Sequence, residues 1–172
     1  MERLIRWIER LTRMGESCAT ACVLALVLLV FGNVVARYGF NRSAMALQEL
    51  QWYFYGLSFL IAMAPTLLTD GHVRIDILYA RLPARWQRWI DVWGTLLFLL
   101  PFTVLILWAS QDFVAYSLAI REGSPNPGGL PAVYLFKMAI PLGFGLLLLG
   151  SFVFLWRRAR GEKAASRWGK QL

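Results

Sequence analysis

The chain has 172 residues and a formal net charge of +8, and its 58% hydrophobic and 16% charged residues lie outside the usual range of soluble proteins. This composition predicts a single integral membrane domain. The excess of Lys and Arg could suit nucleic acid, but the basic residues flank apolar stretches and no nucleic-acid-binding motif accompanies them. Anionic lipid and membrane orientation explain the charge better, so we expect no nucleic-acid partner.

Residues 2–14 have the pattern of an amphipathic helix that lies on a membrane surface, with apolar residues on one face and arginines on the other. Residues 17–36 follow and carry no charge. At 1.5 Å per residue this stretch can cross a hydrocarbon core of about 30 Å. A basic leader before an apolar stretch is also typical of a signal peptide, but further apolar stretches follow, which favours an uncleaved first span.

Three more apolar stretches predict membrane spans over residues 51–69, 92–111 and 132–156. We expect Pro65 and Pro101 to bend the second and third spans. Between these two spans, residues 70–91 predict a second surface helix, with arginines on one side and aromatic residues on a neighbouring side. The side chains assigned to the lipid interface are Arg74, Arg81, Arg85, Arg88, Trp86 and Trp89.

Lys and Arg are distributed unevenly between the two sides of this arrangement. Fourteen belong to the N-terminal segment, residues 70–91 and the tail 157–172, whereas four belong to the opposite side. Because cytoplasmic segments carry the excess of Lys and Arg, we expect both termini in the cytoplasm. The predicted fold class is therefore an all-α membrane protein with four transmembrane helices and two interfacial helices.

The inventory of reactive side chains is small. His72 is the only histidine, so this chain cannot form a multi-histidine metal site or a bis-histidine haem site by itself. Cys18 and Cys22 lie in the first apolar stretch, where packing is favoured over redox chemistry. No Asp or Glu lies in the middle of a predicted span, so the usual ionisable group of a cation carrier is missing. We predict no catalytic residue, metal, cofactor or substrate site, and no enzyme.

Polar residues near the span ends remain as candidates for structural or partner contacts: Asn33, Arg37, Glu49, His72, Arg74, Asp76 and Lys137. Arg37 and Glu49 could pair across the first hairpin, or each could reach water separately. Asn33 lies one turn before Arg37 on the same face, which suggests an interhelical hydrogen bond, although a solvated span end is the alternative.

Lys137 lies just inside the fourth span, and we expect it to extend to the interface. The alternative is a buried pair with Glu122, Asp112 or a partner protein. His72 is expected in a local polar cluster rather than as a pH switch. The preceding loop contains SPNPGGLP, a stiff turn with an expected structural role.

Several segments resemble the small membrane subunit of tripartite ATP-independent periplasmic (TRAP) transporters. These segments are a span ending in RYGFNRSA, a turn leading to QEL, the stretch GHVRIDIL and the stretch GGLPAVYLFKMAIPLGF. The resemblance covers nearly the whole chain, and residues 72–76 are its most specific part. This chain departs from the family near Ala46, where a tryptophan is usual, and at Gln48 and Glu49, where the family has two glutamates.

The resemblance implies a partner-dependent transporter in the bacterial inner membrane. In this family a soluble periplasmic protein captures an organic acid, a large membrane subunit moves it with a sodium gradient, and the small subunit braces the large one. The outer loops would help to dock the binding protein, with Arg42, Arg121 and Glu122 as candidate contacts. The alternatives are a self-associating four-span channel or carrier and, disfavoured by the single histidine, a membrane anchor for a redox enzyme.

Overall fold

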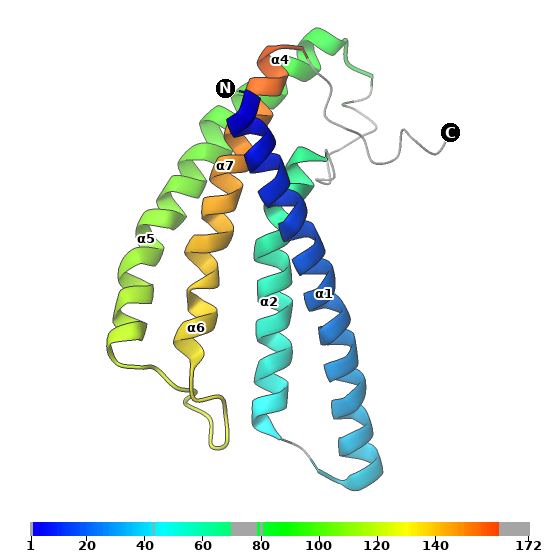
Figure 1. Ribbon diagram of the computed structural model, residues 1–172, viewed down its shortest axis with the longest axis vertical. Helices are drawn as coiled ribbons and strands as arrows, with labels where there is room; N and C mark the ends of the chain where they lie inside the picture. Colours follow the sequence, from blue (N-terminus) through cyan, green and yellow to red (C-terminus); the bar gives the residue numbers. More distant parts are fainter. Residues whose placement is uncertain (1, 43, 70–78, 80, 162–172) are drawn as a thin grey trace.

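The computed structural model describes residues 2–42, 44–69, 79 and 81–161, and every regular element within them is helical (Figure 1). The helices are α1 (Glu2–Phe40), α2 (Met45–Leu68), α4 (Ala84–Gly94), the π-helical turn η1 (Thr95–Leu99), α5 (Leu100–Ala119), α6 (Val133–Lys137) and α7 (Ala139–Ala159). The predicted all-α fold class is confirmed. Three helical stretches are long and apolar enough to cross a membrane, namely Ile5–Phe40, Arg85–Ala119 and Val133–Ala159, and α2 is not among them.

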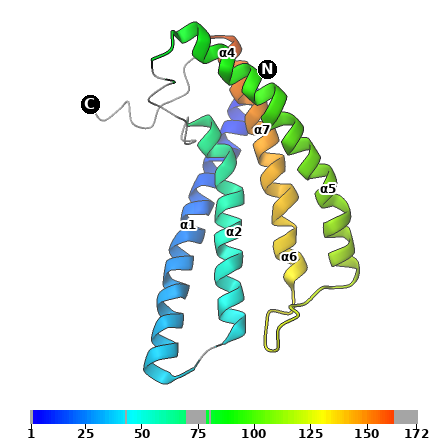
Figure 2. The same ribbon diagram turned by 180° about the vertical axis from the view of Figure 1, so that it is seen from behind.

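The helices form a row in which α1 packs against α2, α2 against α7, and α7 against α5 (Figures 1 and 2). The α1–α2 turn and the α5–α6 loop lie together at one end, which we call the loop end. The first turns of α1, the helix α4 and the last turns of α7 lie at the opposite end, which we call the terminal end. The two hairpins therefore run in the same direction.

The structure corrects the predicted division of the N-terminal region into a surface helix over 2–14 and a span over 17–36. α1 is one helix of 39 residues. Its buried positions recur every three or four residues and form one stripe across the predicted boundary: Ile8, Thr12, Gly15, Ala19 and Cys22. Ile8 joins the main core, and a Cβ atom on Gly15 would lie 3.3 Å from the Ile61 side chain of α2. The helix continues because packing supports both halves.

The helix also runs without a break through the predicted boundary between the surface segment and the third span, at residue 91. α4 continues through η1 into α5, and helix persists from Arg85 to Ala119. The Leu100 N–H bonds the Thr95 carbonyl five residues back, directly before Pro101, which has no N–H to donate. The expected disturbance at Pro101 is thus a π-helical turn without a break. Residues 70–78 and 80 of the predicted surface helix lie outside the described residues.

The core lies towards the terminal end and joins α1, α2 and α7 through Ile8, Leu67, Leu68, Leu147, Val153 and Phe154. At Gly143 the backbones of α7 and α2 approach so closely that a Cβ atom would lie 2.9 Å from the Leu60 carbonyl oxygen. On the outside of the bundle, Leu28, Phe98 and Trp108 are 70%, 76% and 78% exposed. Such an apolar exterior is typical of a surface that contacts lipid or another membrane protein.

Candidate functional site

At the loop end, the Glu49 carboxylate of α2 organises the loop between α5 and α6. It accepts hydrogen bonds from the Ser124 hydroxyl, from the Asn126 side-chain amide at 2.8 Å and from the Leu130 backbone N–H at 2.8 Å. The loop also bonds to itself, because the Ser124 N–H donates to the Leu130 carbonyl at 2.8 Å. The SPNPGGLP turn is therefore closed around a carboxylate that comes from the other hairpin.

This arrangement explains two local features. A Cβ atom on Gly129 would lie 2.5 Å from the Ser124 Cβ atom and 2.8 Å from the Glu49 Oε1 atom, so only glycine leaves room for these two side chains. The Ser124 hydroxyl, followed by Asn126 and Leu130, holds the pKa of Glu49 below its ordinary value of 4.5. Glu49 is thus an ionised acceptor at neutral pH.

The loop itself carries a second carboxylate, Glu122, which joins α5 to α6. The Lys137 ammonium of α6 pairs with its Oε2 atom, and the Ser117 hydroxyl of α5 donates to the same oxygen at 2.6 Å. Lys137 also lies over the Phe113 ring, 4.2 Å from the ring centroid. The hydrogen bond from Lys137 is the main cause that lowers the pKa of Glu122, and Ser117 adds to it. Beside this pair, Tyr53 of α2 stacks on Phe136 of α6 with centroids 4.1 Å apart.

At the terminal end, two adjacent arginines at the end of α7 bind acids on two different elements. The Arg157 guanidinium pairs with the Glu9 Oε1 atom of α1, and Arg158 pairs with the Asp91 Oδ2 atom of α4 at 2.9 Å. The Tyr79 hydroxyl donates to the same Asp91 oxygen at 2.6 Å. The side chains of Asp91 and Arg158 are only 3% and 12% exposed. The last turn of α7 is therefore the point where α1 and α4 are joined.

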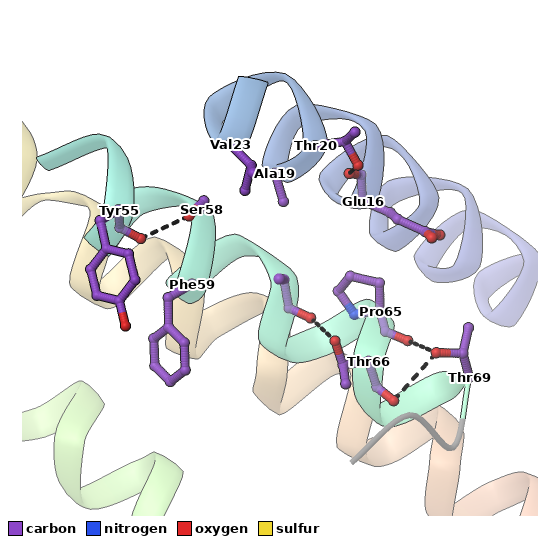
Figure 3. A pocket seen from close by; sticks show the side chains of 11 residues that line it. Glu16, Ala19, Thr20, Val23, Tyr55, Ser58, Phe59, Pro65, Thr66 and Thr69 are labelled. Carbon is purple, nitrogen blue, oxygen red and sulfur yellow. Dashed lines mark hydrogen bonds between the residues drawn. The ribbon is translucent and has the colours of Figure 1, made fainter. Parts of the chain in front are cut away.

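A groove of about 420 Å³ lies between α1 and α2 (Figure 3). The serine and threonine hydroxyls that line it are already bonded to the backbone of their own helices. Within α2, Ser58 donates to the Tyr55 carbonyl at 2.8 Å and Thr66 to the Ala62 carbonyl at 2.6 Å (Figure 3). The groove wall is therefore mostly apolar and suits an acyl chain or an apolar helix better than a polar substrate. The described part of the chain holds no group of three or more His, Cys, Asp or Glu side chains that could bind a metal.

Residues 26–161 match the sequence model of the family described as tripartite ATP-independent periplasmic transporters, DctQ component. The chain belongs to this DctQ family. It is also 25% identical over 153 residues to the isethionate TRAP transporter permease protein DctMQ of Oleidesulfovibrio alaskensis. That match covers 84% of this chain but 23% of the relative, so the chain spans about a quarter of the relative's length. The resemblance read from the sequence is confirmed.

Glu49 and Arg37 are both within the described part of this DctQ chain, and they do not form an ion pair with each other. Glu49 bonds the loop, while the exposed Arg37 guanidinium lies 5.8 Å from the centroid of the neighbouring Tyr38 ring. A hydrogen bond between α1 and α2 comes from Gln51, whose Nε2 atom donates to the Leu29 carbonyl at 3.1 Å. The Asn33 Oδ1 atom is buried and has no hydrogen-bond partner within the described part of the chain.

Of the two alternatives for Lys137, the structure has the pair with Glu122 instead of the expected extension to the interface. The same pair occupies Glu122, which was a candidate docking residue, whereas Arg42 and Arg121 are exposed at the loop end. Sequence reasoning placed Asp91 in a surface helix and did not single it out. The available signal was an acid directly before the charge-free stretch 92–111.

The predicted interfacial residues of the DctQ chain on α4 are exposed: Arg85, Arg88, Trp86 and Trp89. Arg81, just before α4, is exposed as well. The remaining predicted residues, His72, Arg74 and Asp76, lie outside the described residues.

Proposed function

We propose that this chain is the four-span small membrane subunit of a sodium-coupled, binding-protein-dependent transporter for an organic acid, and that it braces a large translocating subunit. The observation that carries the proposal is the pair of polar networks at opposite ends of the bundle. Glu49 ties the two hairpins together at the loop end, and Arg157 and Arg158 tie three elements together at the terminal end. A body fixed at both ends can resist deformation while a partner moves against it.

The four-span arrangement is supported by the distribution of charge along the chain. Residues 17–36, 50–69, 92–111 and 138–156 all lack charged side chains, and each is long enough to cross the hydrocarbon core. α2 therefore fits as a span although its polar and aromatic residues make it less apolar than the other three. With fourteen of the 18 Lys and Arg residues on the terminal side, we assign that end and both termini to the cytoplasm.

The orientation can be measured with single cysteines after the native Cys18 and Cys22 have been replaced by Ala. Pro125→Cys, on the exposed part of the outer loop, should react with a membrane-impermeant thiol reagent added to intact cells. Arg160→Cys, exposed just after α7, should react only after the membrane is opened. The reverse pattern would contradict the assignment.

The need for a larger partner follows from what these spans offer a substrate. An anion that enters the bilayer requires cations, helix ends or hydrogen-bond donors at midplane depth. Here the charged side chains of the described residues gather at the two ends, and the hydroxyls of Ser151 and Thr103 bond their own helix backbones. The DctMQ relative is about four times as long as the part that matches this chain, which supports a large translocating partner for the DctQ part.

The loop end is the proposed docking surface for the soluble binding protein. Arg42 and Arg121 are exposed there and form no ion pair within the described residues, while Glu49 and Glu122 are bonded internally. We therefore expect the docked protein to present acidic side chains. Arg42→Gln and Arg121→Gln should slow its association more than they weaken its affinity, because rim charges act mainly on encounter rates.

The test of the whole proposal is reconstitution into liposomes with a sodium gradient and the binding protein. Isethionate is the first acid to try, because the DctMQ relative is named for it. This chain alone should give no uptake, the large subunit alone little, and both together full uptake. The tagged chain should also copurify with a much larger membrane protein. Sodium-driven uptake by this chain alone would instead support the self-associating carrier.

A further inference from the structure

A second groove, of about 480 Å³, lies on the outside of α4 at the terminal end. Its described lining residues are Arg85, Trp86 and Trp89. Trp86 is 63% exposed and Trp89 is 53% exposed, and Trp89 stacks on Trp93 with ring centroids 5.9 Å apart. None of these side chains takes part in the two polar networks, so the groove has no role in the bracing described above.

The groove lies at the depth of lipid headgroups. The charge-free stretch of this helix begins at Val92, directly after Asp91. With a rise of 1.5 Å per residue, Trp89 lies about 4.5 Å and Arg85 about 10 Å beyond that point. Tryptophan rings are favoured at the boundary between headgroups and acyl chains, and arginines are favoured further out.

The charge around the groove favours an anion. Arg81, Arg85 and Arg88 are exposed and make no ion pair within the described residues. The nearest acid on this helix, Asp91, is engaged by Arg158 and Tyr79, so it does not neutralise them. Arg88 is directed towards the end of α7, because its Nη2 atom lies 3.0 Å from the position of a Cβ atom on Gly161. Arg85 remains as the guanidinium of the groove.

We propose that this groove binds the headgroup of an anionic phospholipid. The planar Arg85 guanidinium donates paired hydrogen bonds to the phosphate, and the Trp86 and Trp89 rings contact the glycerol and the first methylenes of the acyl chains. The positive charge of Arg85 favours an anionic over a zwitterionic lipid, because a choline or ethanolamine group would bring a second cation close to this guanidinium. The site is independent of the proposed transport function.

Native mass spectrometry of the purified full chain, titrated with phosphatidylglycerol or phosphatidylcholine, tests the site. The wild-type chain should bind phosphatidylglycerol in preference. Arg85→Gln should weaken that binding about fivefold, the contribution of one basic residue near an anionic surface. The matched control is Arg10→Gln, which removes one exposed arginine at the same end but from α1. Its phosphatidylglycerol affinity should stay within about twofold of the wild-type value.

A double variant, Trp86→Ala with Trp89→Ala, should lower the affinity for both lipids, because the rings contact parts that the two lipids share. Circular dichroism should show unchanged helix content in every variant. Wild-type affinity in Arg85→Gln, or equal losses in Arg85→Gln and Arg10→Gln, would overturn the proposal, since the attraction would then be general. Displacement of phosphatidylglycerol by millimolar inorganic phosphate would also overturn it, because the groove would then recognise free phosphate.

Discussion

The two ends of the bundle use carboxylates in different ways. At the loop end, Glu49 binds hydroxyl, amide and backbone donors of one loop, and the result is a fixed loop shape. At the terminal end, Arg157 and Arg158 bind acids on α1 and α4, and the result is a fixed arrangement of helices. Burial differs as well, because the Asp91 side chain is 3% exposed whereas Glu122 is 30% exposed.

Because of this difference, we expect the two ends to contribute unequally to the free energy of unfolding. A buried charge is strongly destabilising once its partner is removed, whereas a partly hydrated pair contributes little. The terminal end should therefore determine whether the helices stay together, and the loop end should determine what surface they present. Substitutions at the two ends can separate stability from docking.

The largest effect is expected from Asp91→Ala, which removes the carboxylate that Arg158 binds. The loss should be about 3 kcal/mol in the free energy of unfolding, because the Arg158 guanidinium, which is only 12% exposed, then loses the Asp91 carboxylate. Thermal unfolding in detergent, followed by circular dichroism, measures it. Asp112→Ala is the control, since Asp112 is exposed. The double variant Asp91→Leu with Arg158→Leu should be much more stable than Asp91→Leu alone, because the Arg158 guanidinium is then removed as well. If the double variant is no more stable, the Asp91–Arg158 pair is not the cause of the loss.

A smaller effect is expected from Gly129→Ala at the loop end. The new methyl group would lie 2.5 Å from the Ser124 Cβ atom and 2.8 Å from the Glu49 Oε1 atom, so the loop must shift at a cost of about 1–3 kcal/mol. Docking of the binding protein should weaken as well. Gly123→Ala in the same loop is the control, because its nearest neighbour would be the Pro131 carbonyl oxygen at 3.5 Å. Similar behaviour of the two variants would argue against a tight fit around Glu49.

The loop end should also respond to acid. The folded pKa of Glu49 lies below its ordinary value of 4.5, so its hydrogen bonds stabilise the fold above that pH. Their contribution decreases as the pH falls below 4.5 and is lost once the pH passes the folded pKa. The protection factor of the Leu130 amide, which compares its hydrogen-exchange rate with that of an unprotected amide at the same pH, should fall over this range. Glu49→Gln should remove the part of the response that belongs to Glu49, and an unchanged profile in that variant would contradict the assignment.

The smallest effect is expected from Arg37→Gln. Arg37 is exposed and is not paired with Glu49 among the described residues, so its loss should change stability by less than about 0.5 kcal/mol. Combined with Glu49→Gln, its effect should be additive, because the two side chains have separate surroundings. Chemical unfolding of the two single variants and the double variant forms the required cycle. A clear deviation from additivity would restore the predicted pair.

The helical segments and their apolar character could be predicted from the sequence because both depend on local pattern. Charge-free stretches and aromatic residues at span ends are visible within windows of about 20 residues. The continuity of the helices through the two predicted boundaries has a different origin. The stripe from Ile8 to Cys22 continues across residue 15, and its meaning depends on Ile61 of α2. Periodicity alone could not show that both halves of α1 face the same partner.

The contacts of the candidate site could not be predicted because they join distant parts of the chain. Leu130 lies 81 residues after Glu49, and Arg157 lies 148 residues after Glu9. From the sequence, Arg37 at the end of the first span was expected to lie across the hairpin from Glu49 at the start of the second, and the choice of that partner was reasonable but local. Sequence reasoning did include the Lys137–Glu122 pair as an alternative, since these residues lie only 15 positions apart.

The position of Arg157 and Arg158 at the end of α7 has a consequence for biogenesis. The acids that they bind belong to α1 and α4, which leave the ribosome much earlier and must enter the bilayer before their counter-charges exist. Until then, Glu9 and Asp91 depend on water and lipid headgroups at the membrane surface. A nascent chain that stops before Arg157 can contain every apolar helix and still lack the two ion pairs that join α7 to α1 and α4. Premature termination near residue 156 is therefore expected to yield inserted but unstable subunits, which membrane proteases would remove.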